Sequence, residues 1–103
     1  MKTFFCKLIP PRPTFAQDMS ESEAKLMQEH AAYWKLRMDN GKVVAFGLVG
    51  DPSGPYGIAI VEVETDAEAD GLTSRDPVIL AHRGFKYEIF PMPRGAVHPG
   101  AAA

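Results

Sequence analysis

The histidines of this sequence are the side chains best suited to proton transfer near neutral pH, and one of them has an apolar setting. His30 lies within the stretch AKLMQEHAAYW, three residues after Met27 and four before Trp34. If this stretch is a helix, the three side chains share one face. His30 is therefore either a buried structural histidine with hydrogen-bonded nitrogens or part of a pocket wall.

The other two histidines have settings that are typical of the surface. His82 precedes Arg83 in a segment before the last expected strand, and His98 lies in the C-terminal stretch PRGAVHPGAAA, which has no periodicity. We expect both imidazoles to be solvated.

Asp76 is the carboxylate best suited to act with His30. It precedes Pro77, and an aspartate before proline is typical of a helix start in which the aspartate caps the first turn. An aspartate that accepts a hydrogen bond from one imidazole nitrogen would instead fix the tautomer, which leaves the other nitrogen free as an acid or base. From the residues alone, the role of cap and the role of catalytic partner are equally open.

Four further residues could contact a small-molecule ligand. Tyr33 and Trp34 could stack on an aromatic substrate, although core packing is the more common fate of such rings. Arg12 could anchor an anionic group or lie in solvent. Gly47, inside an expected strand, allows either the close approach of a ligand or a simple bend of the backbone.

Several other kinds of site lack support in the sequence. No pair of histidines or cysteines has the spacing of metal ligands, and no glycine-rich phosphate loop or serine-hydrolase motif occurs. We therefore expect no metal and no cofactor. The net charge is −2 without a basic run, so we expect no nucleic-acid partner, and no apolar run is long enough for a membrane helix.

The single cysteine, Cys6, lies in an apolar run and is expected to be a small buried hydrophobic residue. Because one cysteine cannot form a disulfide within the chain, we expect a reducing compartment, the cytoplasm. The start of the chain, MKTFFCKLIPP, resembles a secretory signal only briefly, since Lys7 and two prolines interrupt it. We interpret it as a strand.

Periodicity and turn signals predict the elements that must position these residues. The expected elements are strands at 3–9, 42–50, 57–65 and 85–92 and a helix over 21–39. The prolines of segment 10–19 predict a long loop there. Ser20 and Glu23 have the spacing of a capping box at the start of the helix, and Thr65 has the same role before a second, shorter helix.

The resulting order β-α-β-β-α-β predicts an α+β fold with a four-stranded antiparallel sheet, strand order 4-1-3-2, and both helices on one face. We expect a single domain over 1–93 and a flexible tail over 94–103. The first three strands carry apolar residues on both faces. The face without helices therefore needs a cover, and we expect a homodimer in which the sheets of two copies pack together.

In their order and spacing, several of these segments resemble the YciI-like (YCII-related) family of small dimeric α/β proteins. The segments are TFFCKLI, EHAAYWKLRMDNGKVVAFG, GLVGDPSG, TDAEADGLTSRDP and KYEIFPM, which lie within residues 3–92. The resemblance implies a ferredoxin-like fold that dimerises into an α/β barrel. It also implies an active site formed by the histidine of the first helix and the aspartate of the Asp-Pro pair, here His30 and Asp76.

The resemblance further implies a small cofactor-independent enzyme. Its His-Asp dyad would transfer a proton on a small cyclic or aromatic substrate, as an isomerase or a dehydrohalogenase-like lyase. A few relatives act on chlorinated hydroxyquinone-type substrates, but this chain departs from the family pattern in its proline-rich 10–13 loop and its C-terminal tail. The alternative is a non-catalytic small-molecule binding or accessory protein on the same scaffold.

Overall fold

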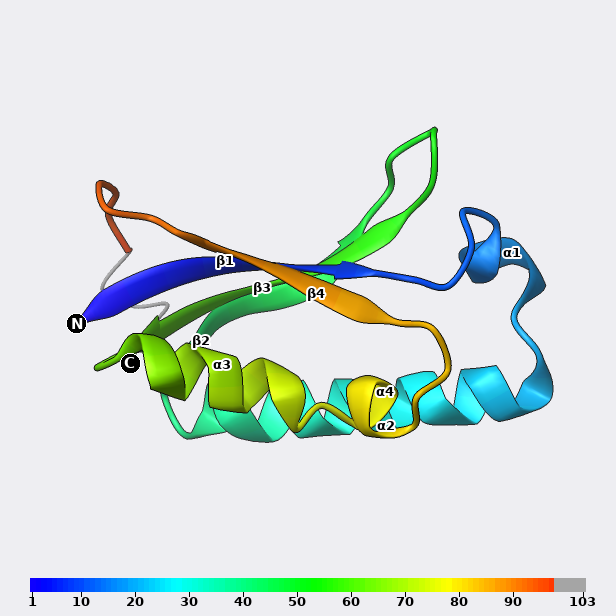
Figure 1. The fold of residues 1–103 in the computed structure, drawn as a ribbon, viewed down its shortest axis with the longest axis horizontal. Helices are drawn as coiled ribbons and strands as arrows, with labels where there is room; N and C mark the ends of the chain where they lie inside the picture. The colour runs from blue at the N-terminus through cyan, green and yellow to red at the C-terminus, as the bar shows by residue number, and fades with distance from the viewer. Residues whose placement is uncertain (98–103) are drawn as a thin grey trace.

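The computed structural model describes residues 1–97, in which a four-stranded sheet lies on a layer of helices (Figure 1). The elements are β1 (Lys2–Ile9), α1 (Phe15–Asp18), α2 (Glu21–Asp39), β2 (Val43–Val49), β3 (Tyr56–Val63), α3 (Asp66–Ser74), α4 (Pro77–Leu80) and β4 (Lys86–Pro91). The strands and helices expected from the sequence are all present, with ends that shift by up to two residues.

The helix starts follow the predicted capping residues. At the start of α2, the Ser20 hydroxyl accepts from the amide of Glu23 at 3.2 Å, and the Glu23 carboxylate accepts from the amide of Ser20 at 2.8 Å. The Thr65 hydroxyl accepts from the amide of Glu68 at 3.1 Å and caps α3 in the same way. Each side chain replaces a partner that the first amides of a helix lack.

The segment 10–19 differs from the expectation of a loop, because it contains the short helix α1. Its last proline, Pro13, comes before the helical turn, where the missing amide hydrogen costs nothing. Phe15 is buried and its ring meets the ring of Phe85 edge-on, with centroids 5.1 Å apart. The burial of this one aromatic ring stabilises a turn that the prolines alone do not predict.

The sheet has the predicted strand order, β2-β3-β1-β4, and every neighbouring pair is antiparallel. Figure 1 shows α2, α3 and α4 together on one side of it. Alternate residues of the strands face these helices and form the main core with them. The buried residues of this core are Phe4, Cys6, Trp34, Val43, Ala59, Val61, Val63, Ala69 and Leu72.

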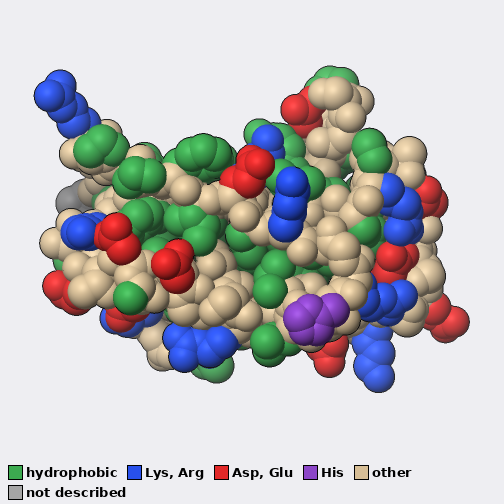
Figure 2. Space-filling model, in the orientation of Figure 1, with side chains coloured by type: hydrophobic (Ala, Val, Ile, Leu, Met, Phe, Trp, Pro, Cys, Tyr) green, Lys and Arg blue, Asp and Glu red, His purple; other side chains and the backbone are tan. Residues whose placement is uncertain are grey.

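The opposite face of the sheet is also apolar at its centre. Phe5 pairs with Ile60 on one side and with Phe90 on the other, so the three side chains point away from the helices. Hydrophobic side chains appear along the upper edge of Figure 2, where the strands run in Figure 1. Within residues 1–97, α2, α3 and α4 lie on the other side of the sheet, and α1 lies beyond the end of the strands.

The structure also bears on the expected absence of a membrane helix and on the expected C-terminal tail. No helix within residues 1–97 is long and apolar enough to span a membrane. Residues 92–97 form no helix or strand, and the remainder of the expected tail, including His98, lies outside the described residues.

Cys6 is fully buried in the sheet, as expected of a small hydrophobic residue. Burial raises the pKa of its thiol to about 11, and the charge of Asp70 acts in the same direction. The thiolate is the reactive form of cysteine. In the folded chain, reagents therefore reach Cys6 poorly, and only a small fraction of its thiol is in the thiolate form.

Thiol labelling tests this burial. At pH 8 in native buffer we expect a thiol reagent such as Ellman's reagent to react with Cys6 at least about 100-fold more slowly than in denaturant, because the thiolate fraction falls with the raised pKa. The release of the reagent's chromophore gives both rates. Equal rates in the two conditions would contradict the buried position.

Candidate active site

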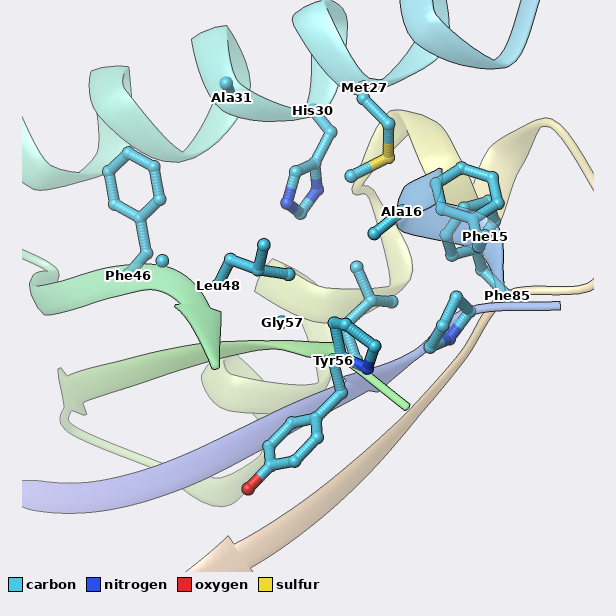
Figure 3. Close-up of a pocket in the computed structure, with 14 residues that line it drawn as sticks. Phe15, Ala16, Met27, His30, Ala31, Phe46, Leu48, Tyr56, Gly57 and Phe85 are labelled. Carbon is cyan, nitrogen blue, oxygen red and sulfur yellow. The ribbon is translucent and has the colours of Figure 1, made fainter. Parts of the chain in front are cut away.

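A pocket of about 220 Å³ opens between α2 and the ends of β2 and β3 that adjoin the 10–19 segment. Figure 3 shows His30 and Met27 extending from α2 toward Leu48 of β2. Aromatic rings provide much of the remaining wall, and they belong to residues from three segments, Phe15, Phe46 and Phe85. The pocket is therefore an apolar space with an imidazole in its wall.

His30 is the polar side chain that faces this space. Its side chain is 15% exposed, so the imidazole is mostly enclosed but still accessible. The other titratable residue of the wall, Tyr56, directs its hydroxyl away from His30 (Figure 3). Within residues 1–97, no lysine, arginine, aspartate or glutamate lines the pocket.

Behind His30 lies the buried carboxylate of Asp76. Nδ1 of His30 and Oδ2 of Asp76 are 2.8 Å apart, although the two residues are 46 positions apart in the sequence. The other oxygen, Oδ1, accepts from the amide of Val78 at 3.0 Å and caps α4. The helix cap and the hydrogen bond to His30 therefore coexist, one on each oxygen of the carboxylate.

Two further donors reach the same oxygen of Asp76. Trp34 Nε1 donates to Oδ2 at 2.7 Å, and the hydroxyl of Tyr87 donates to it at 2.5 Å. Sequence reasoning missed Tyr87 as a member of the site and named Trp34 for a different role, stacking on a substrate. The signal available was that buried Trp and Tyr side chains need hydrogen-bond partners, while Trp34 follows His30 by one helical turn.

The donors keep Asp76 ionised despite its complete burial. Burial alone would raise the pKa of this carboxyl, but the hydrogen bonds and charge of His30, with those from Tyr87 and Trp34, outweigh it and lower the pKa. Burial raises the pKa of the Tyr87 hydroxyl, and the charge of Asp76 adds to this, so Tyr87 keeps its proton.

An ionised Asp76 determines the tautomer of His30. A carboxylate only accepts hydrogen bonds, so Nδ1 of His30 must carry a hydrogen. Within residues 1–97, Nε2 has no hydrogen-bond partner. The imidazole can therefore take up a proton at Nε2 or, when charged, release one from it.

The structure brings one of the four expected binding residues to the pocket. Gly47 lines it, and a Cβ atom built at Gly47 would meet nothing within 4 Å, so the space beside the strand is open. Trp34 is fully buried and Tyr33 donates to the carbonyl of Leu72 at 2.7 Å, so neither ring lines the pocket. Stacking of these two rings on a substrate is thus not supported by their positions.

Arg12 also lies outside the pocket, because carboxylates of the chain hold its guanidinium. It donates to both oxygens of Glu23, at 2.8 and 2.9 Å, and to Asp18 at 2.7 Å. The pair with Glu23 joins the 10–19 segment to the start of α2, which holds Phe15 against the pocket. In this structure Arg12 therefore connects the 10–19 segment to α2.

Metal binding has no evident site in the described chain. Across residues 1–97, no group of three or more His, Cys, Asp or Glu side chains is arranged to hold an ion. The chemistry that this arrangement can perform is proton transfer at Nε2 of His30.

Replacement of Asp76 by asparagine tests the buried network. Asp76→Asn retains the size of the side chain but places an amide N–H among donors, so we expect the free energy of unfolding at pH 7 to fall by about 1–3 kcal/mol. Urea denaturation measures this change. Glu29→Gln, on the exposed side of α2, is the control and should leave the stability within about 0.5 kcal/mol.

The difference in the free energy of unfolding between the native chain and Asp76→Asn should become smaller in acid. The pKa of Asp76 is lowered in the folded chain, so its stabilising effect is complete above the ordinary carboxyl pKa of about 4 and is lost as the pH falls below it. The stability difference between the native chain and Asp76→Asn should therefore shrink below pH 4. A difference that persists unchanged in acid would contradict the ionised state.

Comparison with known proteins places this arrangement in a family. The family model for the YCII-related domain matches residues 3–93. A solved structure of a 5-chloro-2-hydroxyhydroquinone dehydrochlorinase from Burkholderia phenoliruptrix AC1100, in complex with 2,5-dihydroxybenzoquinone, is similar to the chain with a TM-score of 0.62. The two share 19% identity over 89% of this chain and 95% of that chain, a likeness that confirms the ferredoxin-like fold.

The comparison with curated protein sequences found no significant match. The family model, however, covers nearly the whole of the chain. The protein therefore belongs to the YCII-related family.

Proposed function

We propose that the protein is a small enzyme in which His30 transfers a proton on a small cyclic or aromatic substrate. This proposal rests on one observation, the different surroundings of the two nitrogens of the His30 imidazole. Nδ1 is hydrogen-bonded to a buried carboxylate, and Nε2 adjoins an apolar pocket. Asp76 orients the ring and stabilises the charge that the imidazole acquires when it takes the proton.

The size and polarity of the pocket support a single-ring substrate. An apolar cavity of about 150 Å³ can hold a benzene ring, and the volume here is about 220 Å³. The rings of Phe15, Phe46 and Phe85 would contact the faces and edges of such a molecule. Since no lysine or arginine among the described residues lines the wall, a carboxylate or phosphate on the substrate would lack a permanently charged partner.

The proposed reaction begins with an acidic hydrogen of the substrate. Nε2 of His30 takes this proton from a C–H or O–H bond, and the electron pair of the broken bond stays on the substrate. The pair can move to a neighbouring position, where the same proton returns, which gives an isomerisation. In a chlorinated hydroquinone, the return of the proton to the carbon that bears chlorine gives a keto tautomer. Nε2 then takes the proton of a remaining hydroxyl, the electron pair of that O–H bond moves through the ring and expels chloride, and Nε2 passes the proton to water, so the net change is the loss of hydrogen chloride.

The similar solved structure supports the second course. That protein is a dehydrochlorinase, and its structure contains a dihydroxybenzoquinone, a single ring of the size that the pocket accepts. We therefore propose hydroxylated quinones or hydroquinones as the substrate class of this chain.

Replacement of His30 by glutamine tests the proposal. We expect the native chain to release chloride from 5-chloro-2-hydroxyhydroquinone, and His30→Gln to do so about 10²–10⁴-fold more slowly, because one acid–base group is lost. Chloride release measures the rate. His82→Asn is the control, since His82 is exposed and its φ of 53° suits asparagine. Unchanged turnover in His30→Gln would refute the role of His30.

The alternative function is that of a non-catalytic small-molecule binding protein. The observation in its favour is that the pocket wall is apolar apart from one inward-facing polar side chain, which suits binding as well as catalysis. Binding of 2,5-dihydroxybenzoquinone beside His30, detected by NMR, without chloride release from the chlorinated compound would favour this alternative.

We also propose that the protein pairs with a second copy through the outer face of its sheet. The centre of this face is apolar at Phe5, Ile60 and Phe90. Beside it, Lys7 of β1 and Glu88 of β4 are directly opposite each other. A two-fold axis could therefore match apolar with apolar surface and each charge with its opposite.

A charge at the centre of this face should separate the two copies. Ile60→Glu should convert a dimer into a monomer at micromolar concentration, because the carboxylate would be buried without a partner. Sedimentation equilibrium gives the mass. Lys25→Glu, on the exposed side of α2, is the control and should stay dimeric. A native chain that is monomeric in this concentration range would refute the pairing.

The cytoplasm is the compartment that we propose for the protein. Cys6, the one cysteine of the sequence, is a free thiol in the sheet. Reducing compartments maintain cysteine in this state.

A further inference from the structure

One oxygen of Asp76 has more hydrogen-bond donors than lone pairs. A carboxylate has about four acceptor sites, two on each oxygen. Oδ2 is within hydrogen-bond distance of His30 Nδ1, Trp34 Nε1 and the hydroxyl of Tyr87, at 2.8, 2.7 and 2.5 Å. The negative charge on this oxygen is therefore divided among three donors, of which the histidine is one.

We propose that Tyr87 and Trp34 are positioning residues that hold Asp76 as a permanent anion and limit how much of its charge reaches His30. This inference rests on the proposed function and deepens it. In this arrangement, the basicity of His30 depends on a hydroxyl and an indole that do not line the pocket. Tyr87 is the stronger of the two candidates, because its donor lies closer to Oδ2.

The packing of the two aromatic rings fixes these donors in place. The rings of Trp34 and Tyr87 meet edge-on, with centroids 6.2 Å apart and planes at 64°. Trp34 Nε1 also lies 3.1 Å from the hydroxyl oxygen of Tyr87. Trp34 stands on α2 with His30, and Tyr87 stands on β4, so the network joins helix and sheet around the carboxylate.

The proposed arrangement determines where the proton goes. When Nε2 of His30 takes a proton from the substrate, the ring becomes an imidazolium with hydrogens on both nitrogens. The hydrogen on Nδ1 stays there, since Oδ2 already accepts from Trp34 and Tyr87. Asp76 thus stabilises the positive charge without receiving the proton, and Nε2 later returns the proton to the product or to water.

Few other titratable groups face this network. From α2 it is approached by His30, from β4 by Tyr87, and from α4 by the uncharged amide of Val78. From β1 it is approached by Cys6, whose thiol has a pKa of about 11 and is neutral at pH 7. The charge of Asp70 on α3 acts on that thiol. Asp76 is the ionised group that His30 contacts directly.

Removal of the Tyr87 hydroxyl should therefore alter the titration of His30. In Tyr87→Phe, Oδ2 loses one donor, and more of its negative charge acts on Nδ1. The imidazolium is then favoured, because an opposite charge stabilises the charged form. The midpoint of the His30 titration should rise by about 0.5–1 pH unit.

NMR titration of the His30 imidazole between pH 5 and 9 is the experiment. The expected results are a higher midpoint in Tyr87→Phe than in the native chain and a lower one in Asp76→Asn. Tyr33→Phe is the matched control, because it also removes an inward-directed hydroxyl, one that donates to the Leu72 carbonyl and not to Asp76. It should leave the midpoint unchanged while reducing stability.

A second measurement covers the case in which Tyr87→Phe does not fold. Incorporation of 3-fluorotyrosine at position 87 retains the shape of the ring and makes its hydroxyl a stronger donor. The midpoint of the His30 titration should then fall instead of rise.

Equal midpoints in the native, Tyr87→Phe and fluorotyrosine proteins would overturn the proposal and leave Tyr87 with a purely structural role. Because no substrate is used, this result is independent of whether the protein releases chloride.

Discussion

The buried carboxylate of Asp76 is the interaction on which the rest of this structure depends. An ionised group without access to water is costly unless hydrogen bonds replace its hydration. Here the replacements come from three elements: two side chains of α2, an amide of α4 and a hydroxyl of β4. Correct closure of the helix layer onto the sheet is therefore required for the carboxylate to be satisfied, and the site exists only in the folded chain.

The same constraint gives the histidine its chemical character. His30 lies where the hydrogen-bonded core meets the apolar pocket, with one nitrogen directed to each. The far wall of the pocket depends on an ionic contact between Arg12 and Glu23. Arg12 lowers the pKa of Glu23 to about 2, with help from the amide of Ser20. The hydrogen bond to Asp76 orients the imidazole, and the ion pair of Arg12 with Glu23 holds the segment that encloses the pocket.

Most of the fold could be predicted from local patterns, whereas only part of the site could be. Capping residues and alternating apolar residues are signals within a few positions of each other, and they determined α2 and the strand order correctly. His30 and Asp76 could be paired through their residue types and a family resemblance. The hydrogen bonds of Tyr87 and Trp34 to Asp76 could not be predicted. They form because β4 packs against α2, and no local pattern encodes this packing. The carboxylate partners of Arg12 could not be predicted for the same reason, since they come together only in three dimensions.

The central claim is that an anionic Asp76 fixes the hydrogen of His30 on Nδ1 and leaves Nε2 free toward the pocket. The most direct measurement is the ¹⁵N chemical shift of each imidazole nitrogen in the neutral ring, because protonated and unprotonated nitrogens differ widely in shift. We expect a protonated Nδ1 and an unprotonated Nε2 in the native chain. A neutral ring with its hydrogen on Nε2 would contradict it.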